Sequence, residues 1–243
     1  MEVLRSWFEV SYGYREIFSS LEEMLRKKKV YGQDFYRDSG FVARGSDEME
    51  NCLFFPLAID MIARNRHKKV LDLGCGDGTF LRKLCQVNQE VTAIGIDLAP
   101  EAIADGRARA MEAGLQNRIH LFAEDICKLK QLPEPMQGLD VATIVFVLHE
   151  LLYAGEQRVI DFLQSFRAIL PGVPLIVCEA IRPLAEKMRR KPGMSIYYFL
   201  YHDLSNQKPA SRERWHELFR RAGFQTVEER YLRFAGAAVY TVC

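Results

Sequence analysis

Residues 70–80 read Val-Leu-Asp-Leu-Gly-Cys-Gly-Asp-Gly-Thr-Phe, and this stretch decides the fold. Its first four residues are a short apolar run with one acid, which is typical of a buried parallel strand. Three alternating glycines follow, and a helical pattern then runs to residue 87. A strand that turns directly into a helix needs glycine where φ is positive and where the backbone approaches a ligand closely. Because the amides that open such a helix face the ligand, the stretch predicts a nucleotide-binding site.

The next predicted strand, residues 91–96, is apolar and β-branched and stops at Asp97. An acid at the tip of the second strand, roughly 20 residues after the glycine turn, is placed to accept hydrogen bonds from a ribose diol. Dinucleotide-binding enzymes share this arrangement, so the glycines alone do not identify the nucleotide. A third predicted strand, residues 119–123, ends in the polar sequence Glu124-Asp125-Ile126.

Three motifs in order, at 72–78 (Asp-Leu-Gly-Cys-Gly-Asp-Gly), 95–97 (Gly-Ile-Asp) and 123–126 (Ala-Glu-Asp-Ile), resemble those of class I S-adenosylmethionine (SAM) methyltransferases. The resemblance covers about residues 70–179 and implies SAM as the cofactor. It implies that the loop of Gly74, Cys75 and Gly76 lies against the methionine part, which Asp72 helps to hold. It places Asp97 on the ribose, Leu98 on the adenine ring, and Asp125 with Ile126 at the adenine amine and face. The alternatives are a dinucleotide-binding domain and a methyltransferase-like fold that has lost its ligand.

Strand and helix patterns alternate along the chain, which predicts an α/β fold with a parallel sheet and helices on both faces. We expect a Rossmann-like, seven-stranded, mostly parallel sheet with an antiparallel edge. The predicted strands are residues 70–73, 91–96, 119–123, 139–145, 175–179, 226–232 and 237–242.

The domain organisation follows from the same patterns. Residues 1–65 are predicted to be an N-terminal helical cap, and residues 66–243 a SAM-binding domain with a substrate-covering insert at about 180–210. Residues 31–47 contain three glycines with interleaved polar and aromatic residues, and are predicted to be a loop. Such a loop suits a lid over the active site, or it packs the N-terminal helices onto the sheet.

Composition narrows the partners. The chain has 243 residues, of which 49% are hydrophobic, and this suits one soluble globular domain. Its net charge of +1 offers no broad cationic surface, so nucleic acid is not the expected substrate. We expect no membrane segment and no signal peptide, because no apolar run approaches the roughly 20 residues of a membrane helix. Six scattered cysteines indicate reduced thiols. These features predict a cytoplasmic enzyme for a small-molecule substrate and leave a homodimer open.

Candidate catalytic residues follow the predicted strand at 139–145. Methyl transfer is an in-line displacement in which the protein aligns the acceptor and excludes water, often with a base that removes a proton. Phe146 is expected beside the sulfonium, and His149 is the candidate base. His149 could instead satisfy a backbone group at the start of a helix.

A second resemblance is carried by His202-Asp203-Leu204-Ser205-Asn206-Gln207 and by residues 211–224. They resemble the carboxyl-terminal half of bacterial α-keto acid C-methyltransferases of natural-product pathways. In that family a metal is held by a His-acid pair and by a second histidine, so the resemblance implies His149, Glu150 and His202 as catalytic metal ligands. Divalent iron or zinc suits such a set, and could stabilise an enolate of the keto acid. Glu150 stands where we expect Asp, and the N-terminal region is shorter than in that family.

The sequence therefore predicts C-methylation of an α-keto acid, and other reactions stay open. One is an O- or N-methyltransferase without a metal. Another resembles the azetidine-carboxylate synthases, in which the amine of SAM attacks its own Cγ and releases methylthioadenosine. Aromatic residues would then hold the sulfonium by cation–π contact, the candidates being Phe146, Tyr12, Tyr14 and Tyr198. A non-catalytic SAM-binding regulator is the remaining alternative.

Overall fold

Seven strands form a single sheet in the order β3-β2-β1-β4-β5-β7-β6 within the described part of the chain. The computed structural model describes residues 2–129, 138–190, 195–232 and 236–243. Neighbouring strands from β3 to β5 are parallel, and β7 is antiparallel to both of its neighbours. The predicted fold class is confirmed. The strands are β1 Lys69–Leu73, β2 Thr92–Asp97, β3 Ile119–Ala123, β4 Val141–Val145, β5 Leu175–Ala180, β6 Thr226–Leu232 and β7 Ala237–Val242.

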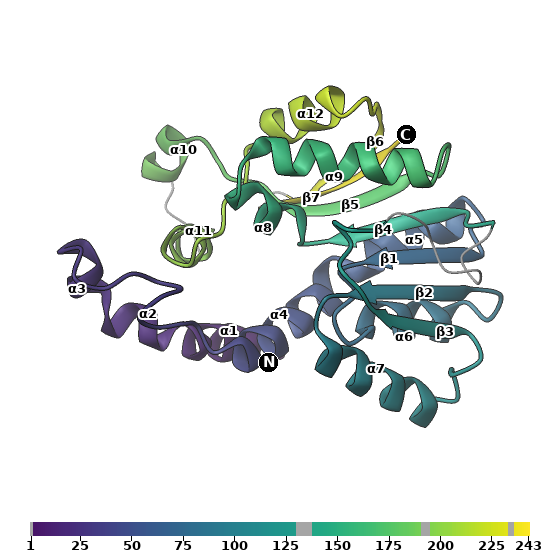
Figure 1. Cartoon of the computed structure of the whole chain (residues 1–243), viewed down its shortest axis with the longest axis horizontal. Coiled ribbons are helices and arrows are strands. Elements are labelled where there is room, and N and C mark those ends of the chain that lie inside the picture. The colour runs from purple at the N-terminus through teal and green to yellow at the C-terminus, as the bar shows by residue number, and fades with distance from the viewer. Residues whose placement is uncertain (1, 130–137, 191–194, 233–235) are drawn as a thin grey trace.

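Helices cover both faces of this sheet (Figure 1). Alternate residues of the strands face opposite ways, so Val70 packs with α5, α6 and α7, whereas Leu71 and Leu73 pack with α9 and α12. The chain order reverses between β1 and β4, where ligands bind beyond the carboxyl ends of parallel strands. The helices are α5 Phe55–Arg64, α6 Thr79–Val87, α7 Pro100–Glu112, α8 Leu148–Tyr153, α9 Glu156–Ile169 and α12 Arg212–Arg221.

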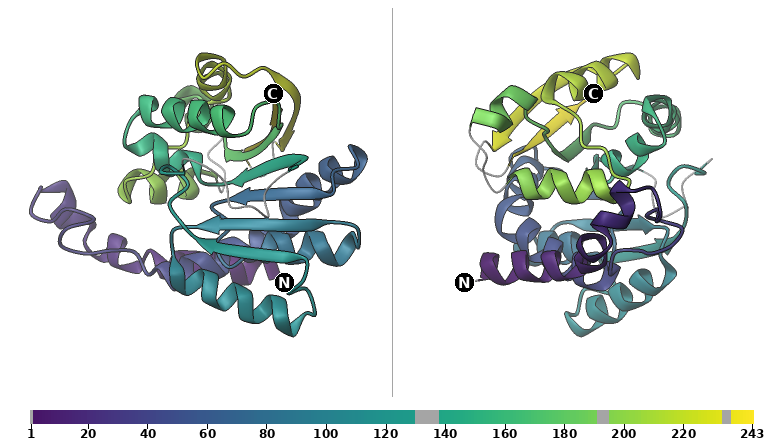
Figure 2. Two further views of the ribbon diagram at one scale, coloured as in Figure 1. Left: turned by 45° about the vertical axis from the view of Figure 1, so that its right-hand side comes forward. Right: turned by 90° about the vertical axis from the view of Figure 1, so that its left-hand side faces the viewer.

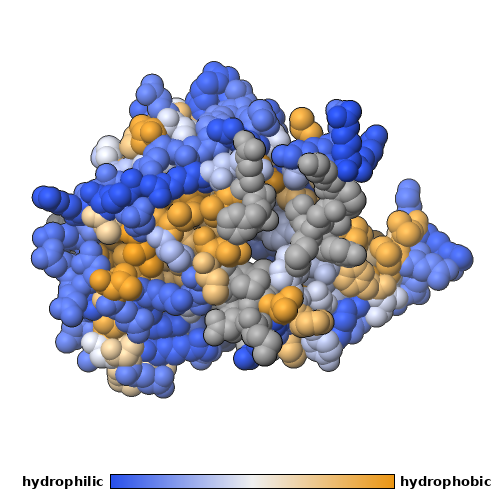
Figure 3. Space-filling model, turned by 180° about the vertical axis from the view of Figure 1, so that it is seen from behind, coloured by the Kyte–Doolittle hydropathy of each residue, from blue (hydrophilic) through white to orange (hydrophobic). Residues whose placement is uncertain are grey.

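The N-terminal helices project from one end of the sheet. They are α1 Glu2–Gly13, α2 Arg15–Ser19, α3 Leu21–Leu25 and α4 Ser39–Leu53. In Figure 3 hydrophobic surface lies along this arm, which ends in a hydrophilic tip. Several side chains of α1 are exposed and apolar, among them Leu4 and Phe8. The N-terminal helices therefore expose apolar side chains in addition to those that they bury against the rest of the fold.

The predicted loop at residues 31–47 is wrong in its second half, because α4 begins at Ser39. Asp38 caps this helix by accepting a hydrogen bond from the Phe41 amide at 3.2 Å. Gly45 suggested a loop, but it lies in the helix where α1 crosses closely: a Cβ there would stand 2.6 Å from the Ser6 carbonyl oxygen. The glycine permits close helix packing. Within the predicted helical cap, α4 is followed directly by α5, with the break at Phe54.

The described part of the insert between β5 and α12 forms the helices α10 Ala185–Arg190 and α11 Ser195–Leu204. Tyr201 of α11 stacks on Tyr14 with ring centroids 4.7 Å apart, and both belong to a small cluster with Val10 and Ile17. Figure 2 shows α11 beside the N-terminal helices. Among the described residues, no helix has the length and apolar character needed to cross a bilayer.

Candidate active site

A cavity of about 610 Å³ lies at the carboxyl ends of β1, β2 and β4. Its walls include residues from the glycine loop and from the start of α8. The N-terminal helices and α11 form two coverings over it. The residues that line it include Arg37, Asp72, Gly74, Gly76, Asp97, Phe146, His149, Glu150, Tyr198 and His202. The cofactor loop and the candidate catalytic residues therefore share one space.

The glycine loop adopts the backbone conformation that its sequence predicts. Gly74 has a φ of 77°, and a Cβ at this position would stand 2.5 Å from a methyl group of Val147. Gly76 has a φ of 54°, and its amide donates a hydrogen bond to Oδ2 of Asp97 at 2.9 Å. Cys75, between them, is buried against Gly95. At Gly74 only glycine meets both demands, a left-handed backbone and a close neighbour.

Two carboxylates, Asp97 and Asp72, flank this loop in different surroundings. Oδ1 of Asp97 accepts a hydrogen bond from the Ala99 amide at 2.9 Å, so both oxygens are oriented by backbone and each keeps a free lone pair. Asp72 is 3% exposed and accepts a hydrogen bond from Thr143 at 2.7 Å. Burial raises the pKa of Asp72 to about 7, against the opposing effect of that hydrogen bond.

The predicted adenine residues lie outside the cavity lining. Leu98 is 69% exposed. Asp125 accepts a hydrogen bond from the Cys127 amide at 2.9 Å and pairs with Lys128. Ile126 packs against the core beside the sheet. Their roles towards adenine stay a prediction.

Phe146, at the end of β4, has a φ of 54°, which is uncommon outside glycine. Its amide donates to the Cys178 carbonyl at 2.8 Å, and its ring meets Phe54 edge-on at 4.9 Å. A strained conformation of this kind costs about 1–3 kcal/mol and clusters at functional sites. The left-handed conformation of Phe146 produces a sharp turn between β4 and α8. Phe146 and His149 both face the cavity as a result.

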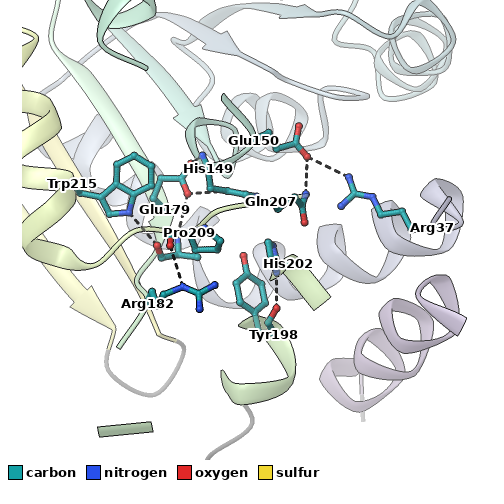
Figure 4. A network of polar contacts seen from close by, with 11 residues as sticks. Arg37, His149, Glu150, Glu179, Arg182, Tyr198, His202, Gln207, Pro209 and Trp215 are labelled. Atoms are coloured by element: carbon teal, nitrogen blue, oxygen red, sulfur yellow. Dashed lines mark hydrogen bonds and ion pairs between the residues drawn. The ribbon is translucent and has the colours of Figure 1, made fainter. Parts of the chain in front are cut away.

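His149 and Glu179 form a buried dyad (Figure 4). Nδ1 of His149 lies 2.9 Å from Oε2 of Glu179, and the His149 amide donates to Oε1 at 3.2 Å. His149 is 3% exposed and Glu179 fully buried. Burial alone would lower the pKa of His149, but the charge and hydrogen bond of Glu179 outweigh it and raise that pKa. A carboxylate on Nδ1 fixes the tautomer that leaves Nε2 as a base.

His202 faces this dyad from α11. Its ring centroid lies 5.2 Å from that of His149, and its Nδ1 hydrogen-bonds the Tyr198 carbonyl at 2.6 Å. Burial, followed by the charge of His149, lowers the pKa of His202 to about 3. His202 is therefore a neutral imidazole.

The Glu150 carboxylate is not grouped with His149 and His202. Its Oε1 accepts hydrogen bonds from Gln207 at 3.0 Å and from Arg37 at 3.3 Å. Across the ranges that the structure describes, no three His, Cys, Asp or Glu side chains are grouped to hold a metal ion. The predicted ligand set of His149, Glu150 and His202 is therefore not assembled.

Sequence reasoning missed two residues of the site, Glu179 and Arg37. Glu179 stood at the end of a predicted strand, and an acid inside a buried apolar run was the available indication. Arg37 falls within residues 31–47, which the sequence predicts to be a loop. It lies in the cavity wall, where it donates to the Tyr14 hydroxyl at 3.1 Å as well as to Glu150.

Residues 64–223 match the protein family described as a methyltransferase domain, which is well over half of the chain. The chain belongs to this family. Solved structures agree on the fold: an O-methyltransferase family protein from Burkholderia thailandensis aligns with a TM-score of 0.67 at 18% identity, covering 96% of this chain and 70% of that one. The predicted class is confirmed: the protein is a class I methyltransferase that uses SAM.

Two curated relatives of this methyltransferase stand out. The 2-ketoarginine methyltransferase of Streptomyces arginensis is 32% identical over 238 residues, which span 93% of this chain and 66% of the relative. The indolepyruvate C-methyltransferase of Streptomyces griseus is 29% identical over 164 residues, spanning 66% of this chain and 47% of the relative. The chain thus spans between about half and two thirds of the length of these relatives.

Proposed function

We propose that this methyltransferase transfers the methyl group of SAM to the carbon next to the ketone of a small α-keto acid. The observation that carries the proposal is that a base backed by a buried acid, His149 with Glu179, opens on the same cavity as the SAM loop. The relatives named as 2-ketoarginine and indolepyruvate methyltransferases support the same substrate class.

Arg37 is the group that binds the substrate carboxylate. Its guanidinium is held by the Tyr14 hydroxyl through Nη1 and by Glu150 through Nη2. An arginine has five N–H donors, so donors remain for a carboxylate in the cavity, where a charge-assisted pair also fixes orientation. Glu150 and Gln207 then act as residues that position Arg37.

Proton transfer falls to His149. Nε2 removes a proton from the carbon next to the ketone, and the C–H electron pair forms the enolate. The enolate carbon attacks the SAM methyl group, and the carbon–sulfur bond breaks with its electrons moving to sulfur, which leaves neutral S-adenosylhomocysteine. The proton stays on His149, where Glu179 stabilises the imidazolium. Phe146 and the two coverings exclude water from the sulfonium.

The resemblance to α-keto acid C-methyltransferases also implies a metal ion, but the side chains around the two histidines do not fit one. Both histidines are oriented through Nδ1, as metal ligands commonly are. A third ligand is missing from the described residues, because Arg37 and Gln207 engage Glu150. We therefore assign the proton transfer to His149 itself.

The test is product analysis with SAM and a panel of α-keto acids, each carrying two deuterium atoms on the carbon next to the ketone. C-methylation replaces one deuterium by a methyl group and releases S-adenosylhomocysteine. A new methyl group found on oxygen by NMR, either in an ester that keeps both deuterium atoms or in an enol ether that keeps one, would indicate O-methylation. Methylthioadenosine would indicate cyclisation of SAM, and either result refutes the proposal. Trimethylpyruvate is the matched control, because it has no hydrogen on that carbon and should give no product.

A further inference from the structure

Tyr198 occupies a position in the cavity that the steps above leave unused. It lies on α11, one turn before His202, and its ring centroid stands 3.9 Å from that of His202. The residue lines the cavity together with His149. In Figure 4 its hydroxyl end points to the side on which His149 and Glu179 lie.

The hydroxyl of Tyr198 has no hydrogen-bond partner among the described residues, and this sets it apart from the neighbouring tyrosines. The Tyr14 hydroxyl is bound by Arg37 and Gln207, and the Tyr201 hydroxyl by Ser11. A polar group that faces a cavity without a protein partner is available to a ligand.

The surroundings of Tyr198 keep it a donor. Burial raises its pKa well above the usual range, and the charges of Glu179 and Glu50 add to that effect. A phenol is in any case protonated near neutral pH, so the Tyr198 hydroxyl can donate a hydrogen bond to a ligand oxygen.

We propose that the Tyr198 hydroxyl donates a hydrogen bond to the ketone oxygen of the substrate and stabilises the enolate oxygen. This inference rests on the proposed function. When His149 takes the proton, the C–H electron pair becomes the new carbon–carbon double bond and the carbonyl pair moves to oxygen. The negative charge then lies on this oxygen, which accepts the hydrogen bond of Tyr198. No proton leaves Tyr198, and the pair returns to the ketone as the carbon attacks the methyl group.

Chemistry requires such a donor. A carbon next to a ketone is a far weaker acid than an imidazolium, so His149 alone leaves the enolate too high in free energy. Donors that are already aimed at the position of a developing oxyanion stabilise it strongly in a site that excludes water. A protonated tyrosine serves this purpose for the enolate of ketosteroid isomerase. Arg37 is not available to the enolate oxygen, because its remaining donors bind the substrate carboxylate.

The test is Tyr198→Phe, which removes the hydroxyl and keeps the ring. Wild-type enzyme with S-adenosylhomocysteine bound should exchange the substrate hydrogens next to the ketone in heavy water, a reaction that needs enolisation but no methyl transfer. Exchange and methylation should both fall about 100-fold or more in the variant, as for loss of one oxyanion donor. The affinity for S-adenosylhomocysteine should stay within about twofold, because the proposed hydrogen bond is made to the substrate and not to the cofactor. Tyr153→Phe, an exposed position on α8, is the control that should change neither rate.

The outcomes separate the two proposals. Exchange in the wild type that Tyr198→Phe leaves unchanged would overturn the role of Tyr198 alone. A wild type that neither exchanges nor methylates any α-keto acid would overturn the proposed function and this role with it. A fall in methylation without a fall in exchange would place Tyr198 at the sulfonium and also refute the inference.

Discussion

Glu179→Gln is the substitution that tests the catalytic dyad most directly. Glu179 accepts hydrogen bonds from the His149 amide at 3.2 Å, from Nδ1 of His149 at 2.9 Å and from the Ala180 amide at 3.3 Å. Glutamine has nearly the same shape but only one acceptor oxygen. Its NH₂ group must therefore face at least one N–H, and a buried donor without a partner costs about 1–3 kcal/mol. We expect the free energy of unfolding to fall by about this amount.

The loss of stability should depend on pH with a defined sign. Glu179 raises the pKa of His149 in the folded state, so the dyad stabilises the fold fully below the unfolded pKa, about 6.5. That contribution is lost as pH rises through the folded pKa. Urea unfolding should therefore show a larger difference between wild type and Glu179→Gln at about pH 6 than at about pH 9.

Catalysis should respond in the same variant. General base catalysis contributes about 10²–10⁴-fold, so we expect kcat to fall at least about 100-fold when the orienting carboxylate is lost. The rate rises with pH as His149 loses its proton, and removal of the Glu179 charge should move this limb of the kcat profile to lower pH. Glu150→Gln removes the same charge from a half-exposed position and should move the limb less. An unmoved limb with unchanged kcat in Glu179→Gln would refute the dyad.

Three further predictions concern the cofactor, the buried acid and the metal. Asp97→Ala should weaken S-adenosylhomocysteine binding by about 2–3 kcal/mol in calorimetry, because hydrogen bonds to a charged acceptor are lost; unchanged affinity, or NAD binding to the wild type, would contradict it. Burial raises the folded-state pKa of Asp72 to about 7, so its contribution to stability declines as pH rises from about 4 to 7. In Asp72→Asn the free energy of unfolding should therefore vary less with pH over that range. An equally steep dependence in the variant would count against this prediction. Enzyme dialysed against a chelator should keep its activity, whereas a loss that iron or zinc restores would place the metal on His149 and His202.

The parallel core was predictable because its elements carry local patterns. β3, β6 and β7 have the predicted bounds, and the other strands differ at one or both ends by one or two residues. Alternating burial and terminal glycines fix such elements within a few residues of sequence. Residues 39–47 were not predictable as helix, because the glycine that allows α1 to approach closely is the same residue that marks loops.

The candidate site divides in the same way, according to how far apart its partners lie in the sequence. Gly76 and Asp97, which form the cofactor loop contact, are 21 residues apart, and one strand-helix-strand unit brings them together. Arg37 and Glu150 are 113 residues apart, and Tyr14 and Gln207 are 193 apart. A local motif can encode the first contact, but the others depend on how two coverings meet over the sheet.

This difference explains why the cofactor could be predicted from the sequence and the residues of the acceptor pocket could not. The SAM loop needs glycines with left-handed φ and an acid at the next strand tip, and these demands leave few alternatives in sequence. An acceptor pocket needs only a cation, a base and a donor that converge, and many sequences can supply them from any surrounding helix. Arg37, His149 and Tyr198 come from three separate segments, and only their common cavity gives each a role. Substrate choice can therefore change through α11 and the N-terminal helices while the cofactor half stays the same.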